Sequence, residues 1–123
     1  MPAGVHEIGV ASGVPGKALA VSASVTDPAQ VRSIVSRIDR LPVAQPGVLP
    51  CPMLTANGPT VTFTFRAATG GRVLAQATQL MLGGRSGPCD PMRFTIAGAA
   101  QTPLLGGSGF VAAVGTLLGL ELG

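Results

Sequence analysis

The chain has 123 residues, the size of one domain, and its composition argues against several classes of protein. Hydrophobic residues make up 46% and charged residues only 11%, so the chain has enough apolar side chains to fold rather than stay disordered. The net charge of +3 comes from scattered arginines and only five acids. Because neither a cluster of cations nor stacking aromatic residues are present, nucleic-acid binding is not expected.

The start of the chain differs in composition from the rest. Residues 1–16 are rich in Gly and Pro around a short apolar patch, and we expect them to form a flexible lead-in or an edge strand. The remaining residues, 17–123, are expected to form one domain. From Lys17 to Thr26 apolar residues alternate with small polar ones, which is the period of a half-buried strand. Its inward positions are Leu19, Val21, Ala23 and Val25.

A helix is predicted directly after this strand. Asp27 is placed to cap its first turn, and Pro28 suits the first helical position. Pro42 ends the helix, because the residue before a proline is pushed out of the helical region. Between them, apolar residues recur at helical spacing: Val31, Ile34, Val35, Ile38 and Leu41.

A β-hairpin is predicted in the middle of the chain. The proline-rich segment 41–59 is expected to be a rigid crossover loop. Strand Thr60–Arg66 follows, and a turn at Gly70–Gly71 leads to the partner strand Arg72–Leu82. The outward threonines of the first strand suit an exposed strand position and also occur on some flat binding faces: Thr60, Thr62 and Thr64.

The last part of the chain predicts one more strand and a second helix. The strand covers Met92–Ala97, and a loop rich in small residues, Gly98–Gly109, leads to Ser108 as a possible helix cap. The order strand, helix, three strands, helix favours the α+β class. We expect an antiparallel sheet of about four strands with two helices on one face. The apolar positions of the second helix are Phe110, Val111, Val114, Leu117 and Leu118.

The most apolar segment, Phe110–Leu122, is shorter than the about 20 residues that a membrane span needs. It is therefore predicted as a buried helix, and no transmembrane span is expected. Gly115 and Gly119 each weaken this helix by about 1 kcal/mol relative to Ala. The helix consequently needs packing against the sheet to persist.

Cys51 and Cys89 form the most informative pair of residues. Both lie beside prolines in irregular segments, one before and one after the predicted hairpin, so the hairpin would bring them together. We predict a structural disulfide between them; the alternative is a pair of free buried thiols. A disulfide indicates an oxidising compartment outside the cytoplasm. Redox catalysis is not expected, because the chain has no Cys-x-x-Cys motif.

No set of residues predicts a catalytic, cofactor or metal site. His6 is the only histidine, so a zinc site lacks ligands. Asp27 and Asp39 would stand roughly 18 Å apart along the predicted helix, too far for paired carboxylate chemistry. The Gly-rich stretch Leu105–Gly109 lacks the lysine and the glycine spacing of nucleotide-binding loops.

Five segments occur in an order that resembles a group of small secreted proteins and lipoproteins of actinobacteria, whose function is uncharacterised. They are VSASVTDPAQVRSIVSRIDRLP, LPCP, GPTVTFTFRAATGGRV, GPCDPMRFTIAG and FVAAVGTLLGL. The similarity covers about residues 19–122; Asp27–Pro42 resembles the helix of that group, and Cys51-Pro52 resembles its Cys-Pro pair. The chain departs from the group in lacking a visible signal peptide, a lipobox cysteine and aromatic residues beside the strands. The resemblance implies no catalytic residues.

We therefore expect a non-catalytic domain, secreted or of the cell envelope, that binds an unknown protein or small ligand and needs no cofactor. No secretory signal is visible between Met1 and Ala20. One alternative is an enzyme with a Ser/Thr-based site, at the loop before Ser108. Another is a structural subunit that forms homo-oligomers through its apolar surface, as the mean hydropathy of +0.50 suggests. The sequence identifies neither the ligand nor the oligomeric state.

The predicted disulfide can be tested by counting thiols. Protein denatured without reductant should show no reactive thiol, and a reduced control should show two. Loss of the disulfide should lower the free energy of unfolding by about 4 kcal/mol, because the loop closed between Cys51 and Cys89 is long. Two reactive thiols in the non-reduced sample would contradict the prediction.

Overall fold

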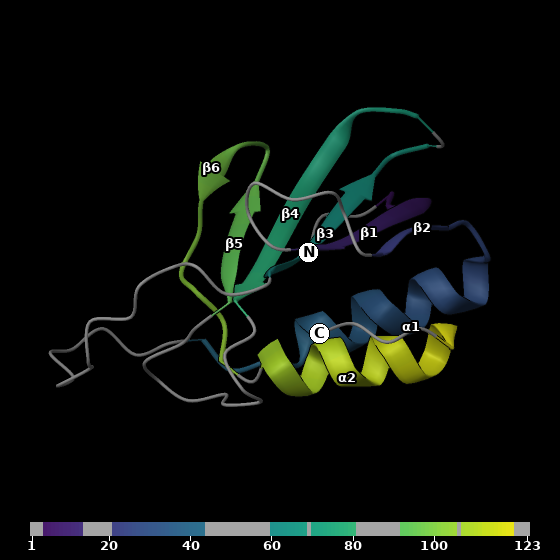
Figure 1. Ribbon diagram of the computed structural model, residues 1–123. Helices are drawn as coiled ribbons and strands as arrows, with labels where there is room; N and C mark the ends of the chain where they lie inside the picture. Colours follow the sequence, from purple (N-terminus) through teal and green to yellow (C-terminus); the bar gives the residue numbers. More distant parts are fainter. Residues whose placement is uncertain are drawn as a thin grey trace, which may run out of the picture.

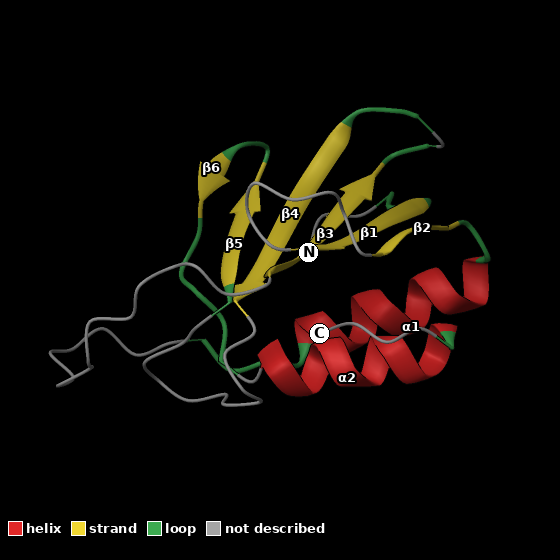
Figure 2. Ribbon diagram, in the orientation of Figure 1, coloured by secondary structure: helices red, strands yellow, loops and turns green. Residues whose placement is uncertain are grey.

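The computed structural model describes residues 4–13, 21–43, 60–68, 70–80, 92–105 and 107–119. Within these ranges the chain forms one antiparallel sheet and two helices, and both helices lie against the same side of the sheet (Figures 1 and 2). The predicted α+β class with an antiparallel sheet is confirmed. The sheet has six strands in the order β2-β1-β3-β4-β5-β6, so the expected number of about four was too low.

The bounds of the elements follow the chain in the order strand, strand, helix, four strands, helix. The strands are β1 (Glu7–Gly13), β2 (Val21–Val25), β3 (Thr60–Arg66), β4 (Val73–Leu80), β5 (Arg93–Ile96) and β6 (Ala99–Ala100). The helices are α1 (Pro28–Asp39) and α2 (Gly107–Leu118).

Strand β1 corrects the expectation for the start of the chain. Residues 7–13 pair with β2 on one side and with β3 on the other, so they form neither a flexible lead-in nor an edge strand. Ile8 and Val10 are buried on the helix side of the sheet. Gly9 and Ala11 alternate with them, and such small residues give little periodic signal in a segment already rich in glycine.

The last two strands replace one predicted strand and part of a predicted loop. Met92 lies just before β5 and forms an isolated bridge with Leu104. Ala97 and Gly98 then have φ angles of 51° and 80°, and β6 turns back to pair with β5. Two positive φ angles are what a tight two-residue hairpin needs, but Ala rarely adopts one. No pattern in the sequence therefore predicts this turn.

Helix α1 forms where the sequence predicts it. The side chain of Asp27 accepts a hydrogen bond of 2.8 Å from the backbone N–H of Ala29, and Pro28 opens the first turn. The helix ends at Asp39, three residues before Pro42. It buries Val31, Ile34 and Ile38 against the sheet, which are positions of the predicted apolar face.

Helix α2 begins and ends differently from the expectation. It starts at Gly107, so Ser108 lies inside its first turn rather than at the cap. Gly119 follows the last helical residue with a φ of 67° and ends the helix in the left-handed conformation that glycine adopts without strain. Gly119 thus terminates α2 and does not weaken its interior.

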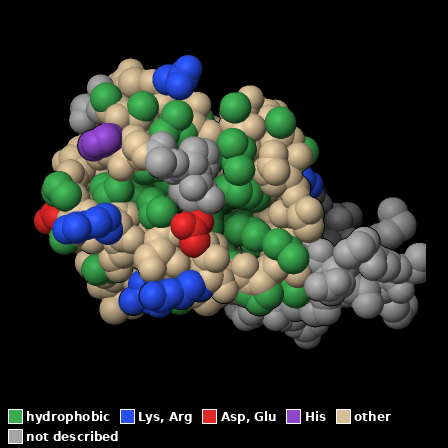
Figure 3. Space-filling model, turned by 180° about the vertical axis from the view of Figure 1, so that it is seen from behind, with side chains coloured by type: hydrophobic (Ala, Val, Ile, Leu, Met, Phe, Trp, Pro, Cys, Tyr) green, Lys and Arg blue, Asp and Glu red, His purple; other side chains and the backbone are tan. Residues whose placement is uncertain are grey.

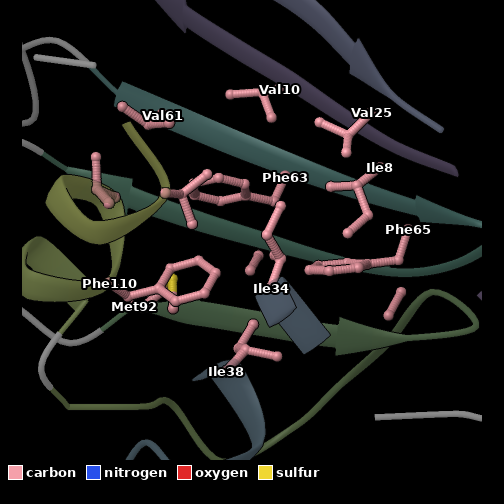
Figure 4. Packing of buried hydrophobic residues seen from close by; sticks show 14 of the residues in the cluster. Ile8, Val10, Val25, Ile34, Ile38, Val61, Phe63, Phe65, Met92 and Phe110 are labelled. Atoms are coloured by element: carbon pink, nitrogen blue, oxygen red, sulfur yellow. The ribbon is translucent and has the colours of Figure 1, made fainter. Parts of the chain in front are cut away.

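The core lies between the two helices and the sheet (Figure 4). Phe63 and Phe65 on β3 are fully buried, and Ile34 of α1 points toward them. The ring of Phe63 meets the ring of Phe110 of α2 edge to face, with centroids 4.9 Å apart and planes at 67°. The strand at the middle of the sheet is therefore held by both helices.

Truncation of this central ring gives a test of the core. Phe63→Ala should lower the free energy of unfolding by about 3–5 kcal/mol, because it removes a fully buried aromatic side chain. Arg37→Ala, at an exposed position of α1, should change it by less than about 0.5 kcal/mol. Urea titrations followed by circular dichroism measure both. A similar loss in the two variants would contradict this account of the core.

Candidate functional site

The face of the sheet opposite the helices is lined by small and polar side chains. The threonines of β3 lie on it, because they alternate with buried Val61, Phe63 and Phe65. Thr62 and Thr78 face each other with hydroxyl oxygens 3.4 Å apart, and Gln76 donates a hydrogen bond of 3.4 Å to Thr64. We call this surface the open face. Residues on it include Glu7, Gly9, Ala11, Ser22, Ser24, Thr60, Thr62, Thr64, Arg66, Gln76, Thr78, Arg93 and Thr95.

One carboxylate is nearly buried on the open face. Glu7 of β1 is 7% exposed, and it accepts a hydrogen bond of 3.1 Å from the Ser24 hydroxyl and one of 3.4 Å from the Gly70 N–H. The Nε of Arg66 lies 3.6 Å from the same carboxylate. Arg66 also donates to the carbonyl of Gly71 at 3.1 Å. We call these residues the Glu7 cluster; it connects β2, β1 and β3 to the turn before β4.

The Glu7 cluster was missed at the sequence level. Glu7 falls in the segment expected to be a lead-in, and Arg66 is far from it in the chain. The two residues meet because they are register partners in the pairing of β1 with β3. The only signal in the sequence was the apolar alternation of Ile8 and Val10 next to Glu7. This alternation indicates a strand but not which strand pairs with it.

The other titratable residues considered in the sequence lie apart. His6 is exposed, and its Nδ1 is 2.8 Å from the carbonyl oxygen of Gly4. Asp27 caps the start of α1, whereas Asp39 is its last residue, so the two carboxylates lie at opposite ends of the helix. In the described ranges no group of three or more His, Cys, Asp and Glu could hold a metal ion. None of the described helices is long and apolar enough to cross a membrane.

Cys51 and Cys89 lie outside the described residues, so their disulfide stays a prediction. The described residues nearest to them in the chain do lie close together. Val43 and Met92 both form antiparallel bridges with Leu104. Thr60 and Leu80, at the open end of the β3–β4 hairpin, are register partners. The described residues that flank the two cysteine-bearing segments are therefore neighbours in the fold.

A groove of about 540 Å³ runs along α1, and we call it the α1 groove. Gly4 and Val5 line one side of it, and α1 lines the other. Its apolar part consists of Val5, Val31 and Val35, of which Val31 is buried and the other two pack against the core. Its polar part consists of Arg32, Ser36, Asp39 and Arg40, with both arginines exposed.

On one face of the molecule the basic side chains are not gathered in one patch (Figure 3). On the face drawn in Figure 3, basic side chains lie at separate places with hydrophobic and polar side chains between them. Arg66 is already engaged by Glu7. The α1 groove places two cations beside aliphatic side chains.

Comparison with known proteins adds no relative: no family model, no curated protein and no solved structure matches the chain. The resemblance to small actinobacterial proteins stays a prediction. What the protein does must therefore be argued from its own residues.

The Glu7 cluster generates a prediction about stability. Glu7→Ala should lower the free energy of unfolding by about 1–3 kcal/mol, because the variant removes the acceptor of Ser24 and of the Gly70 N–H and the charge partner of Arg66. Arg66→Ala should cost less in the Glu7→Ala background than in the unmodified protein. Ser22→Ala, an exposed change on the same strand as Ser24, serves as the control. Strictly additive effects of the Glu7 and Arg66 changes would show that the pair is not coupled.

Proposed function

We propose that the protein is a non-catalytic binding domain, secreted or of the cell envelope, and that its α1 groove takes an acidic peptide segment with an aliphatic side chain. The observation that carries this proposal is the make-up of the groove. It combines aliphatic side chains along its wall with two exposed arginines, Arg32 on α1 and Arg40 directly after its last residue.

The apolar part of the groove suits one aliphatic side chain of a ligand. Val5 and Val35 are partly buried against the core, so they present a fixed surface. Covering them removes apolar area from water, which is favourable by about 25 cal/mol for each Å². An aliphatic side chain of the ligand would therefore lie between the helix and residues 4–5.

The arginines define the charge of the ligand. Arg32 lies on α1 and Arg40 is its C-cap residue, eight positions later, which corresponds to about 12 Å along the helix axis. An extended peptide covers this distance in about four residues. Since alternate side chains of an extended peptide point the same way, two acids four residues apart would flank an aliphatic residue between them. Asp39 lowers the positive charge beside Arg40 but does not reverse that of the groove.

Two of the three described carboxylates have structural roles, which supports a function without catalysis. Glu7 is held by three partners in the Glu7 cluster, and Asp27 caps α1. His6 is exposed, and its Nδ1 lies 2.8 Å from the backbone carbonyl oxygen of Gly4. The contacts of Glu7 and Asp27 therefore stabilise the fold. The location outside the cytoplasm rests on the predicted disulfide between Cys51 and Cys89.

Two labelled peptides test the ligand chemistry. The first has the pattern Glu-Ser-Leu-Ser-Glu between glycines, and the second has Lys in place of both Glu residues. Fluorescence anisotropy should show binding of the acidic peptide only, and binding should weaken as salt is added because the arginines are exposed. Arg32→Glu should lower the affinity at least about tenfold, since it reverses one of the two charges.

Arg93→Glu is the matched control, because Arg93 is also exposed but lies on the open face of the sheet. It should leave the affinity for the acidic peptide within about twofold, which is less than 1 kcal/mol. Binding of neither peptide, or an equal loss in the Arg32 and Arg93 variants, would refute the α1 groove as the binding site.

A further inference from the structure

Strand β2 is an edge strand of the described sheet, and its own sequence and register show none of the features that protect an edge from within. It is the first strand in the sheet order, with β1 on one side and no described strand on the other (Figure 1). Edges are usually kept from pairing by charged residues, prolines, bulges or very short length. The sequence of β2, VSASV, has no charge and no proline, and its register with β1 runs without interruption over five residues.

The opposite edge of the sheet, β6, is much shorter than β2. Strand β6 has only two residues, so it offers few backbone groups to another chain. The pairing of β3 with β4 contains a register shift next to Arg66. The sheet therefore does contain irregular and shortened pairings, and the edge at β2 has neither.

The sequence of β2 reads the same in both directions. In an antiparallel pair of two β2 strands centred on Ala23, Ala23 faces Ala23 of the second copy, and Ser22 faces Ser24 of the second copy. A twofold symmetric interface requires each surface to be complementary to itself. A palindromic strand meets this condition at every position, because each residue faces its own type.

From these observations we infer that β2 pairs with β2 of a second copy, so that two chains form a twofold symmetric dimer with one continuous sheet. This interface is separate from the α1 groove and does not depend on the function proposed for it. Directly opposed residues of antiparallel strands lie on the same face of a sheet. Ser22 and Ser24 of both copies would therefore extend the open face, and the helices of both copies would lie on the other face.

The strength of the dimer follows from what the edge offers. Val25 is 4% exposed in the single chain, so pairing adds little apolar burial there. Backbone hydrogen bonds of a five-residue strand supply most of the affinity. Such a contact is smaller than the about 1,200 Å² of stable interfaces. The dimer should accordingly form with a dissociation constant between ~1 μM and ~1 mM.

Sedimentation equilibrium over this concentration range tests the inference. The mass should rise from that of one chain, 12.2 kDa, toward twice that value. In the dimer the Ser22 side chains of the two copies lie diagonally, about 7–8 Å apart. Ser22→Lys and Ser22→Glu should each remain monomeric, because like charges then approach across the interface. An equal mixture of the two variants should recover the dimer.

Gln76→Lys is the control variant, since Gln76 is exposed on the open face but belongs to β4, away from the β2 edge. It should dimerise as the unmodified chain does. A monomer at all concentrations would overturn the inference, as would dimers of the Ser22→Lys variant equal to those of the unmodified chain. A mixture of the charged variants that stays monomeric, or a loss of the dimer in Gln76→Lys, would place the contact elsewhere and overturn it too.

Discussion

The burial of two phenylalanines on the central strand is the constraint on which the rest of the structure depends. Phe63 and Phe65 lie on β3, and both have no exposed surface. The chain has only four aromatic residues, all of them Phe, so these two rings provide much of the bulk of the core. Helices α1 and α2 must both lie on this side of the sheet to cover them (Figure 4). As a consequence, both described helices lie on one face, and the small and polar residues that alternate with the phenylalanines lie on the other.

A sheet face that carries no described helix is stable in water only if its side chains suit water, and β3 meets this demand by alternation. Its threonines form hydrogen bonds with β4 across the open face, while the residues between them pack into the core. Glu7 adds a charged contact at one end of the same face. It reaches β2 through Ser24 and the turn before β4 through Gly70, so it stabilises the pairing of strands that are distant in the sequence. Among the described residues, specific polar contacts thus stabilise the face of the sheet on which neither α1 nor α2 lies.

The elements that the sequence predicted well are those with two independent signals. Helix α1 has a cap at Asp27 as well as an apolar stripe, and β3 has strict alternation followed by a glycine turn. Strand β1 has only Ile8 and Val10 among small residues, and β6 depends on a positive φ at Ala97, which no sequence pattern marks. The α1 groove was beyond prediction because it needs Val5, ahead of β1, to lie beside α1. Sites formed between elements require the register and the packing, which single-segment patterns do not contain.

The two proposed contacts lie on consecutive elements, and this bears on how the protein would bind. Strand β2 ends at Val25 and α1 begins at Pro28, so pairing of two β2 strands would also fix the positions of the two α1 helices relative to the twofold axis. Each dimer would then carry two α1 grooves at a set separation. A partner with two acidic segments at a matching distance gains avidity, which raises apparent affinity by about 10²–10⁴ without any new contact. A groove with low affinity for a single segment can in this way support tight binding, but only of ligands that carry the acidic segment more than once.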